Sequence, residues 1–430
     1  MPDDCQLDFE TRQIHAGAVV ESQNSARFTP IYQTAGYVFD DFADGADRFA
    51  GRGGRAYSRN DNPTNAVAGA RLADLEGGTD GILVASGQAA IAMAITALAK
   101  SGDHILATRQ LYEGTREMFR GVLSRQGIEV EYIDADATEA EWAERFRPTT
   151  RLVYTETLPN PLNQVVDIER LATIAHSAGV PLIVDNTVPT PYLCQPISYG
   201  ADIVIHSTSK WLSGHGSVIG GAIIDAGSFD WKAHAQRFPQ LTSPIREGVP
   251  SFAERFGAKA YLAYVRSVIV LEYGPTVPAF STFLLLHGIE TLSVRMDRHV
   301  ANAERLAAWL NDRPEVERVY HPSIPTSPEY QLAQRYFPRG AGSIVSFDIR
   351  GGEPAAARFL DSLSLITQMT HIGDVRTLAL HLASTIHSKL SDSERAEIGI
   401  GPGLIRLSIG LESPGDLIGD LERAFKNSAV

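Results

Sequence analysis

HSTSKWLSGHGSVIGG, residues 206–221, directly follows the apolar run ADIVI, residues 201–205, and this junction decides the fold. A short β-branched run that ends in Ser, Thr and Lys is typical of a buried strand whose carboxyl end faces a ligand site. A lysine held against such a strand end loses hydration, which lowers its pKa and frees the amine to attack carbonyl groups. Taken alone, Lys210 is more commonly a surface residue whose stem packs along apolar neighbours. The junction therefore predicts an α/β sheet and leaves two roles open for Lys210.

Strand-like and helix-like segments alternate on both sides of this junction. The strand-like runs lack strict alternation of polar and apolar residues, as expected for strands buried on both faces of a mainly parallel sheet. These runs are residues 82–86, 104–108, 130–134, 151–157, 181–187 and 201–207, with helices expected at 65–75, at 88–100 and after Tyr112. After about residue 256 long helical stretches, the first at about 259–271, precede strand-like runs at 343–349 and 404–410, which indicates a smaller C-terminal α/β domain. We therefore expect an N-terminal arm over 1–62, a large domain over 63–258 and a C-terminal domain over 259–430.

Composition narrows the possible partners and compartments. With 430 residues, of which 44% are hydrophobic and 21% charged, the chain is long enough for two globular domains. Its net charge of −13 repels nucleic acid and anionic membrane surfaces, so a small molecule is the expected ligand. Cys5 and Cys194 are too few for a disulfide framework, and we expect both to be free thiols. No signal peptide and no apolar run of roughly 18 residues is visible, so the cytoplasm is the expected location.

Polar residues follow several strands at the point where each strand ends. Ser86, Gly87 and Gln88 lead from a strand into a helix, whose first N–H groups can bind an anion. Asp185 ends the run PLIVD, where an aspartate can pair with a pyridinium nitrogen, although a capping or turn role is commoner for Asp. Further polar residues after strands are Tyr112, Asn160, Ser207, Ser209 and Lys210. Because carboxyl ends of parallel strands meet at one edge, these side chains are expected to converge there.

Several common site types are excluded by their missing motifs. The glycines of GHGSVIGG, residues 214–221, have the wrong spacing for a dinucleotide fingerprint and do not open a helix. The chain has neither a Walker A sequence nor a G-x-S-x-G nucleophile turn. His371, His381 and His387 are scattered rather than spaced as metal ligands, and we interpret them as structural or surface residues. No metal is expected.

Taken together, a collinear set of segments resembles the pyridoxal-phosphate enzymes of Cys/Met metabolism, the trans-sulfuration family. The segments are AYSRNDNPT (56–64), ASGQAA (85–90), LYEGT (111–115), ETLPNPLNQVVDI (156–168), LIVDNT (182–187), HSTSKWLSGHGSVIGG (206–221) and GLIRLSIGLE (403–412). The resemblance covers essentially the whole chain. It implies an α/β, aminotransferase-like fold of type I, in which a large domain with a mainly parallel sheet binds pyridoxal 5′-phosphate. It also implies a homo-oligomer, usually a tetramer, whose subunits share active sites.

The resemblance also implies roles for individual residues. Lys210 would form the Schiff base, Asp185 would keep the pyridine nitrogen protonated, and Tyr112 would stack on the ring and take part in proton transfer. The phosphate would be bound by Gly87, Gln88, Ser207 and Ser209, and by Tyr57 and Arg59 from the arm of a neighbouring subunit. Arg406 would clamp the substrate carboxylate with help from Asn160, because a planar guanidinium fixes both charge and orientation. His371 would also contact the substrate. It stands where the family often has Asn in an N-I-G-D motif, and Leu382 stands where H-P-A-S is usual, both in the substrate-facing part of the C-terminal domain.

Within the family, residues 229–241 and 283–299 are most similar to O-acetylhomoserine sulfhydrylases. This similarity implies γ-replacement, in which O-acetyl-L-homoserine and sulfide, or methanethiol, give homocysteine, or methionine, and acetate. A methionine γ-lyase or a cystathionine γ-synthase is the alternative within the family; the γ-lyases typically carry Cys where this chain has Gly114. A cofactor-free α/β binding protein, in which Lys210 and Asp185 are structural, is the alternative from a different class.

Overall fold

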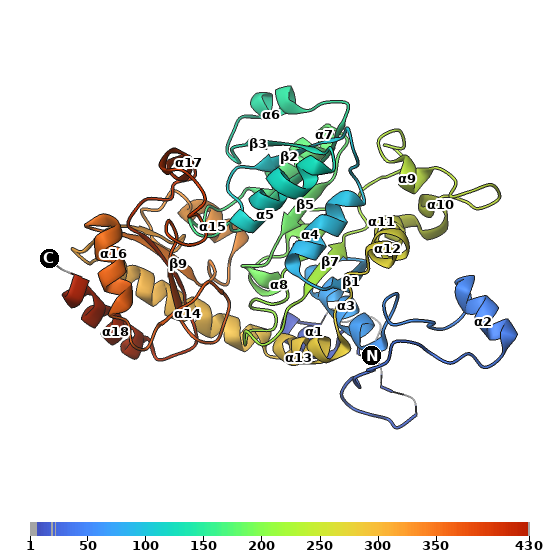
Figure 1. Ribbon diagram of the computed structural model, residues 1–430, viewed down its shortest axis with the longest axis horizontal. Helices are drawn as coiled ribbons and strands as arrows, with labels where there is room; N and C mark the ends of the chain where they lie inside the picture. The colour runs from blue at the N-terminus through green and yellow to red at the C-terminus, as the bar shows by residue number, and fades with distance from the viewer. Residues whose placement is uncertain (1–6, 19, 22, 429–430) are drawn as a thin grey trace.

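The computed structural model describes every residue except 1–6, 19, 22, 429 and 430, and it contains two sheets that lie side by side (Figure 1). Cys5 lies outside the described residues, whereas Cys194 is buried and has a free thiol. None of the described helices is long and apolar enough to cross a lipid bilayer.

The larger sheet has 7 strands in the order β1-β7-β6-β5-β4-β2-β3. The strands are β1 (Asp80–Val84), β2 (His104–Thr108), β3 (Glu129–Ile133), β4 (Thr150–Glu156), β5 (Leu182–Asp185), β6 (Ile203–His206) and β7 (Gly221–Asp225). Strand β7 runs antiparallel to both β1 and β6, and the remaining pairs are parallel. The predicted mainly parallel sheet is therefore confirmed, with one antiparallel strand inserted beside its edge.

Helices cover both faces of this sheet, and local signals fix their ends. They are α3 (Pro63–Glu76), α4 (Gly87–Thr96), α5 (Glu113–Met118), α6 (Glu139–Arg145), α7 (Ile168–Ser177) and α8 (Thr190–Leu193). Helix α3 begins where the Asn62 side chain accepts a hydrogen bond from Thr64 N, and it ends at Gly77 with φ of 78°. Ser86 caps α4 in the same way by accepting from Ala89 N at 3.0 Å. This cap fixes the N-terminus of α4 directly after β1.

A second group of helices extends the covering of the large sheet. These are α9 (Pro239–Thr242), α10 (Phe252–Phe256), α11 (Ala260–Tyr264), α12 (Leu271–Tyr273) and α13 (Ala279–Glu290). Tyr261 on α11 is fully buried, and its hydroxyl donates to the Ala94 carbonyl on α4 at 3.1 Å. Residues just after 258 therefore pack on the large sheet, and the boundary drawn at 258/259 stays a prediction.

The smaller sheet has 5 strands in the order β10-β11-β12-β9-β8, and only β10 and β11 pair in parallel. The elements are α14 (Leu292–Asn311), β8 (Val316–Tyr320), α15 (Tyr330–Tyr336), β9 (Ile344–Ile349), α16 (Gly352–Asp361), β10 (Thr367–Gln368), β11 (Leu378–His381), α17 (Asp392–Glu397), β12 (Leu404–Ser408) and α18 (Pro414–Ser428). Phe347, Phe359 and Phe425 pack their rings together between the sheet and α16 and α18. The predicted smaller C-terminal α/β domain is confirmed.

The N-terminal segment contains α1 (Phe9–His15) and α2 (Phe42–Phe49), and α2 projects away from the rest of the molecule (Figure 1). Apolar side chains on and beside α2 are strongly exposed: Val38 by 90%, Phe42 by 94% and Phe49 by 81%. Clustered exposed apolar residues commonly mark interaction surfaces. The part of the segment around α2 therefore offers an apolar surface, whereas Phe9 of α1 is buried in the same subunit, and the arm over 1–62 stays a prediction.

Candidate active site

A cavity of about 540 Å³ opens where β4, β5 and β6 end, and β12 of the smaller sheet contributes to its wall. The lining of this cavity includes ten of the residues predicted from the sequence. They are Gly87, Gln88, Tyr112, Asn160, Asp185, Ser207, Ser209, Lys210, His371 and Arg406. Tyr57 and Arg59 are not part of this lining. The structure therefore brings together all the predicted site residues except the two that were assigned to a neighbouring subunit. The interpretation of His371 as a structural or surface residue was wrong, because its ring lines the cavity beside Lys210.

Lys210 lies just after β6, and its Nζ is 3.1 Å from Nδ1 of His371. Burial, assisted by the positive charge of Arg406, lowers the pKa of Lys210 to about 8. Burial and the neighbouring Lys210 lower the pKa of His371 to about 4. At neutral pH the imidazole is therefore uncharged and accepts a hydrogen bond from the ammonium group. A lysine with this pKa exposes a larger fraction of free amine at neutral pH than an ordinary surface lysine.

Two carboxylates end adjacent strands in this cavity, because Glu156 and Asp185 are paired in the register of β4 and β5. The backbone N–H of Thr187 donates to Asp185 Oδ1 at 2.9 Å, and burial raises the pKa of Asp185. Glu156 accepts a bond from Tyr112 N at 2.7 Å, and burial beside Asp185 raises its pKa well above its usual range. Sequence reasoning missed Glu156, although its place at the last position of a buried strand was a usable signal. Of the two groups, Asp185 holds the negative charge more readily.

The N-terminus of α4 forms the opposite end of the cavity. A Cβ atom at Gly87 would lie 2.7 Å from Cβ of Ser207, so only glycine allows the helix to approach the loop after β6 this closely. The side chain of Gln88 donates to the Gly114 carbonyl at 2.7 Å, and Ser209 Oγ accepts from Gly220 N at 3.0 Å. Free N–H groups at a helix N-terminus, beside a serine hydroxyl, suit a phosphate or another anion.

Arg406 reaches the cavity from β12 and is only 3% exposed. Its Nη1 donates to Asn160 Oδ1 at 3.1 Å, and its Nη2 donates to the Thr370 carbonyl at 2.9 Å. Burial lowers the pKa of Arg406 to about 10, and its buried Nε has no hydrogen-bond partner among the described residues. The guanidinium is therefore rigidly placed and retains a positive charge that no carboxylate of the chain neutralises through a described ion pair.

Residues 10–426 match the family described as Cys/Met metabolism PLP-dependent enzyme. The chain belongs to this family. As a Cys/Met metabolism PLP-dependent enzyme, it resembles the homocysteine synthase of Schizosaccharomyces pombe, with 41% identity over 97% of this chain and 98% of the relative. It is also 42% identical to O-acetyl-L-homoserine sulfhydrylase 1 of Thermus thermophilus, over 97% of this chain and 100% of the relative.

Solved structures of Cys/Met metabolism enzymes share the fold. A crystal structure from Campylobacter jejuni, assigned as an O-acetylhomoserine (thiol)-lyase, has a TM-score of 0.94 and 34% identity, covering 98% of this chain and 100% of that one. It contains an N′-pyridoxyl-lysine-5′-monophosphate. Cystathionine γ-lyase from Lactobacillus plantarum has a TM-score of 0.83 and 31% identity, over 98% and 99% of the two chains. These matches confirm the predicted type I fold and pyridoxal 5′-phosphate as the cofactor.

The residues of the cavity fit this cofactor. An amine of lowered pKa, a carboxylate at a strand end and a glycine-lined helix N-terminus occur together, and they match its aldehyde, its ring nitrogen and its phosphate. Lys210 and Asp185 would contact the reactive ring, and Gly87 with Ser207 would hold the phosphate.

Two predicted groups lie elsewhere. Arg59 donates from Nη1 to the Leu271 carbonyl at 2.7 Å and lies 5.8 Å from the ring of Tyr57, outside the cavity. Their action in a neighbouring subunit stays a prediction.

His381 is buried and is hydrogen-bonded to Ser384 Oγ at 2.7 Å, which gives it a structural role among the described residues. In the part of the chain that the structure describes, no group of three or more His, Cys, Asp or Glu is placed to hold a metal ion.

Proposed function

We propose that the protein is an O-acetylhomoserine sulfhydrylase, which converts O-acetyl-L-homoserine and sulfide, or methanethiol, into homocysteine, or methionine, and acetate. The observation that carries the proposal is the placement of Lys210, Asp185 and Arg406 on one cavity. This arrangement offers an amine, a ring-nitrogen partner and a carboxylate clamp to one amino acid. The relatives named homocysteine synthase and O-acetyl-L-homoserine sulfhydrylase, at 41% and 42% identity, support this choice of substrates.

Bound pyridoxal phosphate supplies an aldehyde that condenses with amines and a ring that withdraws electrons. Arg406, fixed by Asn160, binds the substrate carboxylate and sets which bonds of the amino acid face Lys210. The free amine of Lys210 takes the proton from Cα and, once its Nζ has released that proton, takes a second one from Cβ, so that the γ-acetoxy group leaves as acetate. Sulfide then forms the new bond at Cγ, and protons return to Cβ and Cα to give homocysteine. Asp185 holds its negative charge at the strand end, and Tyr112 covers the cavity from the start of α5.

Gly114 favours replacement over elimination. A Cβ atom at this position would lie 2.4 Å from Cε1 of Tyr112, so the tyrosine ring occupies the space that a side chain would need. The cysteine typical of γ-lyases at this position would therefore require a different placement of Tyr112. The observed ring position supports the sulfhydrylase over the lyase.

The acceptor is a small thiol. Apolar residues on the cavity wall are Ile91, Leu158, Val188, Ile219, Met369 and Ile372. Such a wall accommodates sulfide and also the methyl group of methanethiol, whereas an acceptor with charged groups in addition to its sulfur would lose more hydration there. We assign acetyl as the leaving group on the strength of the relatives.

The arm supports assembly with further copies of the chain, which we propose to be a cytoplasmic homotetramer with shared active sites. Phe42 and Phe49 are too exposed to contribute to the core of their own subunit, at 94% and 81%. Burial of these side chains against a second copy would bring Tyr57 and Arg59 toward that copy, where they would contribute to its phosphate site.

Product analysis tests the proposed reaction. The purified holoenzyme is incubated with O-acetylhomoserine, with and without sulfide, and homocysteine and 2-oxobutyrate are measured. Homocysteine should dominate when sulfide is present, and Lys210→Ala should abolish turnover while the protein remains folded. Dominance of 2-oxobutyrate whether or not sulfide is added would instead identify an eliminating lyase.

A further inference from the structure

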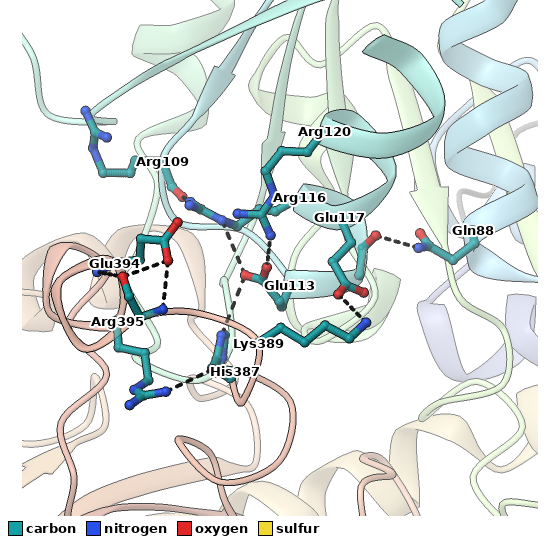
Figure 2. Close-up of polar contacts among 12 residues, drawn as sticks. Gln88, Arg109, Glu113, Arg116, Glu117, Arg120, His387, Lys389, Glu394 and Arg395 are labelled. Carbon is teal, nitrogen blue, oxygen red and sulfur yellow. Dashed lines mark hydrogen bonds and ion pairs between the residues drawn. The ribbon is translucent and has the colours of Figure 1, made fainter. Parts of the chain in front are cut away.

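A buried cluster of ion pairs lies beside the cavity and is centred on Glu113, the residue that follows Tyr112 (Figure 2). The side chain of Glu113 is only 2% exposed, and three basic side chains converge on its carboxylate. Arg116 Nε lies 3.4 Å from Oε2, Arg120 Nη2 contacts Oε1, and His387 Nδ1 lies 3.6 Å from Oε2. Glu113 does not line the cavity, so none of the roles proposed above uses it.

The cluster joins two parts of the molecule that are far apart in the sequence. Glu113, Arg116 and Arg120 belong to α5 and the turn after it, whereas His387 belongs to residues 382–391, which follow β11 of the smaller sheet. This segment is folded locally, because Arg395 Nη1 donates to the Leu390 carbonyl at 2.7 Å. The Glu113 carboxylate on α5 therefore contacts an ordered segment, residues 382–391.

A second link between the same two elements offers a matched comparison. Glu117, one helical turn after Glu113, pairs with Lys389 at 2.9 Å, but these side chains are 43% and 79% exposed. Exposed pairs of this kind contribute little because water screens them. The Glu113 carboxylate is shielded from water, so removal of its charge leaves Arg116, whose side chain is 14% exposed, without a buried counter-charge.

The backbone around Tyr112 is otherwise held at only a few points. Its N–H donates to Glu156 at 2.7 Å, and the next carbonyl after Glu113, that of Gly114, accepts from Gln88 at 2.7 Å. Both contacts come from the large domain. Glu113 therefore supplies a buried side-chain connection from this turn to the C-terminal domain that carries Arg406, whereas the Glu117–Lys389 link is exposed.

We propose that Glu113 is a positioning residue, which fixes Tyr112 over the cavity and holds residues 382–391 against α5. Burial alone would raise the pKa of Glu113, but contact with His387 and the charges of Arg120 and Arg116 outweigh it and lower the pKa, so the carboxylate is ionised at neutral pH. The effect on turnover rests on the proposed function, whereas the effect on the bound cofactor does not.

The test compares Glu113→Gln with Glu117→Gln in the holoenzyme. Visible circular dichroism reports how the bound cofactor sits in its asymmetric surroundings, and steady-state kinetics separate kcat from KM. For Glu113→Gln we expect an altered visible signal and a kcat about 10- to 100-fold lower, with KM for the amino acid nearly unchanged, because a small misplacement of a catalytic group acts mainly on the chemical step. Glu117→Gln should match the wild type in both readouts.

Other outcomes would overturn the proposal. If Glu113→Gln lowers the unfolding temperature but leaves the visible signal and kcat as in the wild type, the cluster is purely structural. If Glu117→Gln causes the same changes, the buried position has no special role. Should Glu113→Gln not fold, His387→Gln removes only the partner across the contact; it should shift the visible signal in the same way, and an unchanged signal would refute the positioning role. A wild type that forms no homocysteine would refute the proposed function alone, since the spectral comparison needs no turnover.

Discussion

Replacement of Lys210 by methionine should stabilise the cofactor-free protein while it abolishes activity. The lysine pKa falls from 10.5 to about 8 in the folded chain, chiefly through burial. A shift of this size corresponds to about 3 kcal/mol, at 1.36 kcal/mol per unit. Because the folded pKa is the lower one, the folded state binds fewer protons than the unfolded state. The cost of the charged lysine is therefore complete below pH 8, and it disappears as pH rises from about 8 to 10.5.

Thermal unfolding of the cofactor-free protein at pH 7 and pH 9.5 measures this effect. Linkage gives a penalty of about 3 kcal/mol at pH 7 and about 1.4 kcal/mol at pH 9.5. For a chain of this length the unfolding entropy is roughly 0.9 kcal/mol/K, so Lys210→Met should raise the Tm by about 3 °C at pH 7 and by about half as much at pH 9.5. Lys259→Met, at an exposed lysine, is the control and should change neither value. An equal gain at both pH values, or none at pH 7, would show that Lys210 does not carry a buried charge.

Three further substitutions have defined outcomes. Arg406→Lys should raise KM for the amino acid roughly 30- to 150-fold with little change in the visible spectrum. An ammonium group cannot replace the planar guanidinium, whose bond to the substrate carboxylate contributes about 2–3 kcal/mol. An unchanged KM would mean that the substrate carboxylate binds elsewhere. Gly114→Ala should displace the Tyr112 ring, which lies 2.4 Å from the added Cβ, and steady-state assays and visible circular dichroism should show a lower kcat and an altered signal. Glu76→Ala removes a fully buried carboxylate whose Oε1 accepts from Asn186 Nδ2 at 2.8 Å and lies 2.6 Å from His206 Nε2. Denaturant unfolding should report a loss of about 3–5 kcal/mol, because both partners are left buried without it, and a loss below about 1 kcal/mol would contradict this.

The strands of the large sheet were predictable because their apolar runs are short and bounded by turn residues. His104–Thr108 coincides with β2, and the predicted run at 201–207 contains β6. Strand β7 was missed, because GAIID follows directly on a glycine-rich loop and has no turn signal before it. The helical stretch predicted over 259–271 is interrupted by a π-helical turn at Val265–Val270, which packing decides and the sequence pattern does not show.

The residues of the site also fall into some that the sequence predicts and some that it does not. Lys210, Asp185 and Gly87 lie at strand ends of one sheet, where sequence order alone predicts convergence. Arg406 comes from the other sheet, and only the resemblance to a known family connected it to the cavity. The Glu113 cluster depends on how residues 382–391 pack against α5, and an acidic residue in a helical first turn gives no sign of a partner so far along the chain.

The position of β7 also sets the order in which the molecule can be built. Strand β1 is hydrogen-bonded to the sheet only through β7, which pairs Ile82 with Ile223. During synthesis, β1 emerges early but has no neighbour to join until residue 225 has left the ribosome. The N-terminus of α4, which would hold the cofactor phosphate, follows β1 directly, so it is among the last parts of the large domain to be anchored. A nascent chain therefore has to complete β7, the strand next to the sheet edge, before it can bind pyridoxal phosphate, and this long-range closure is the step expected to limit its folding rate.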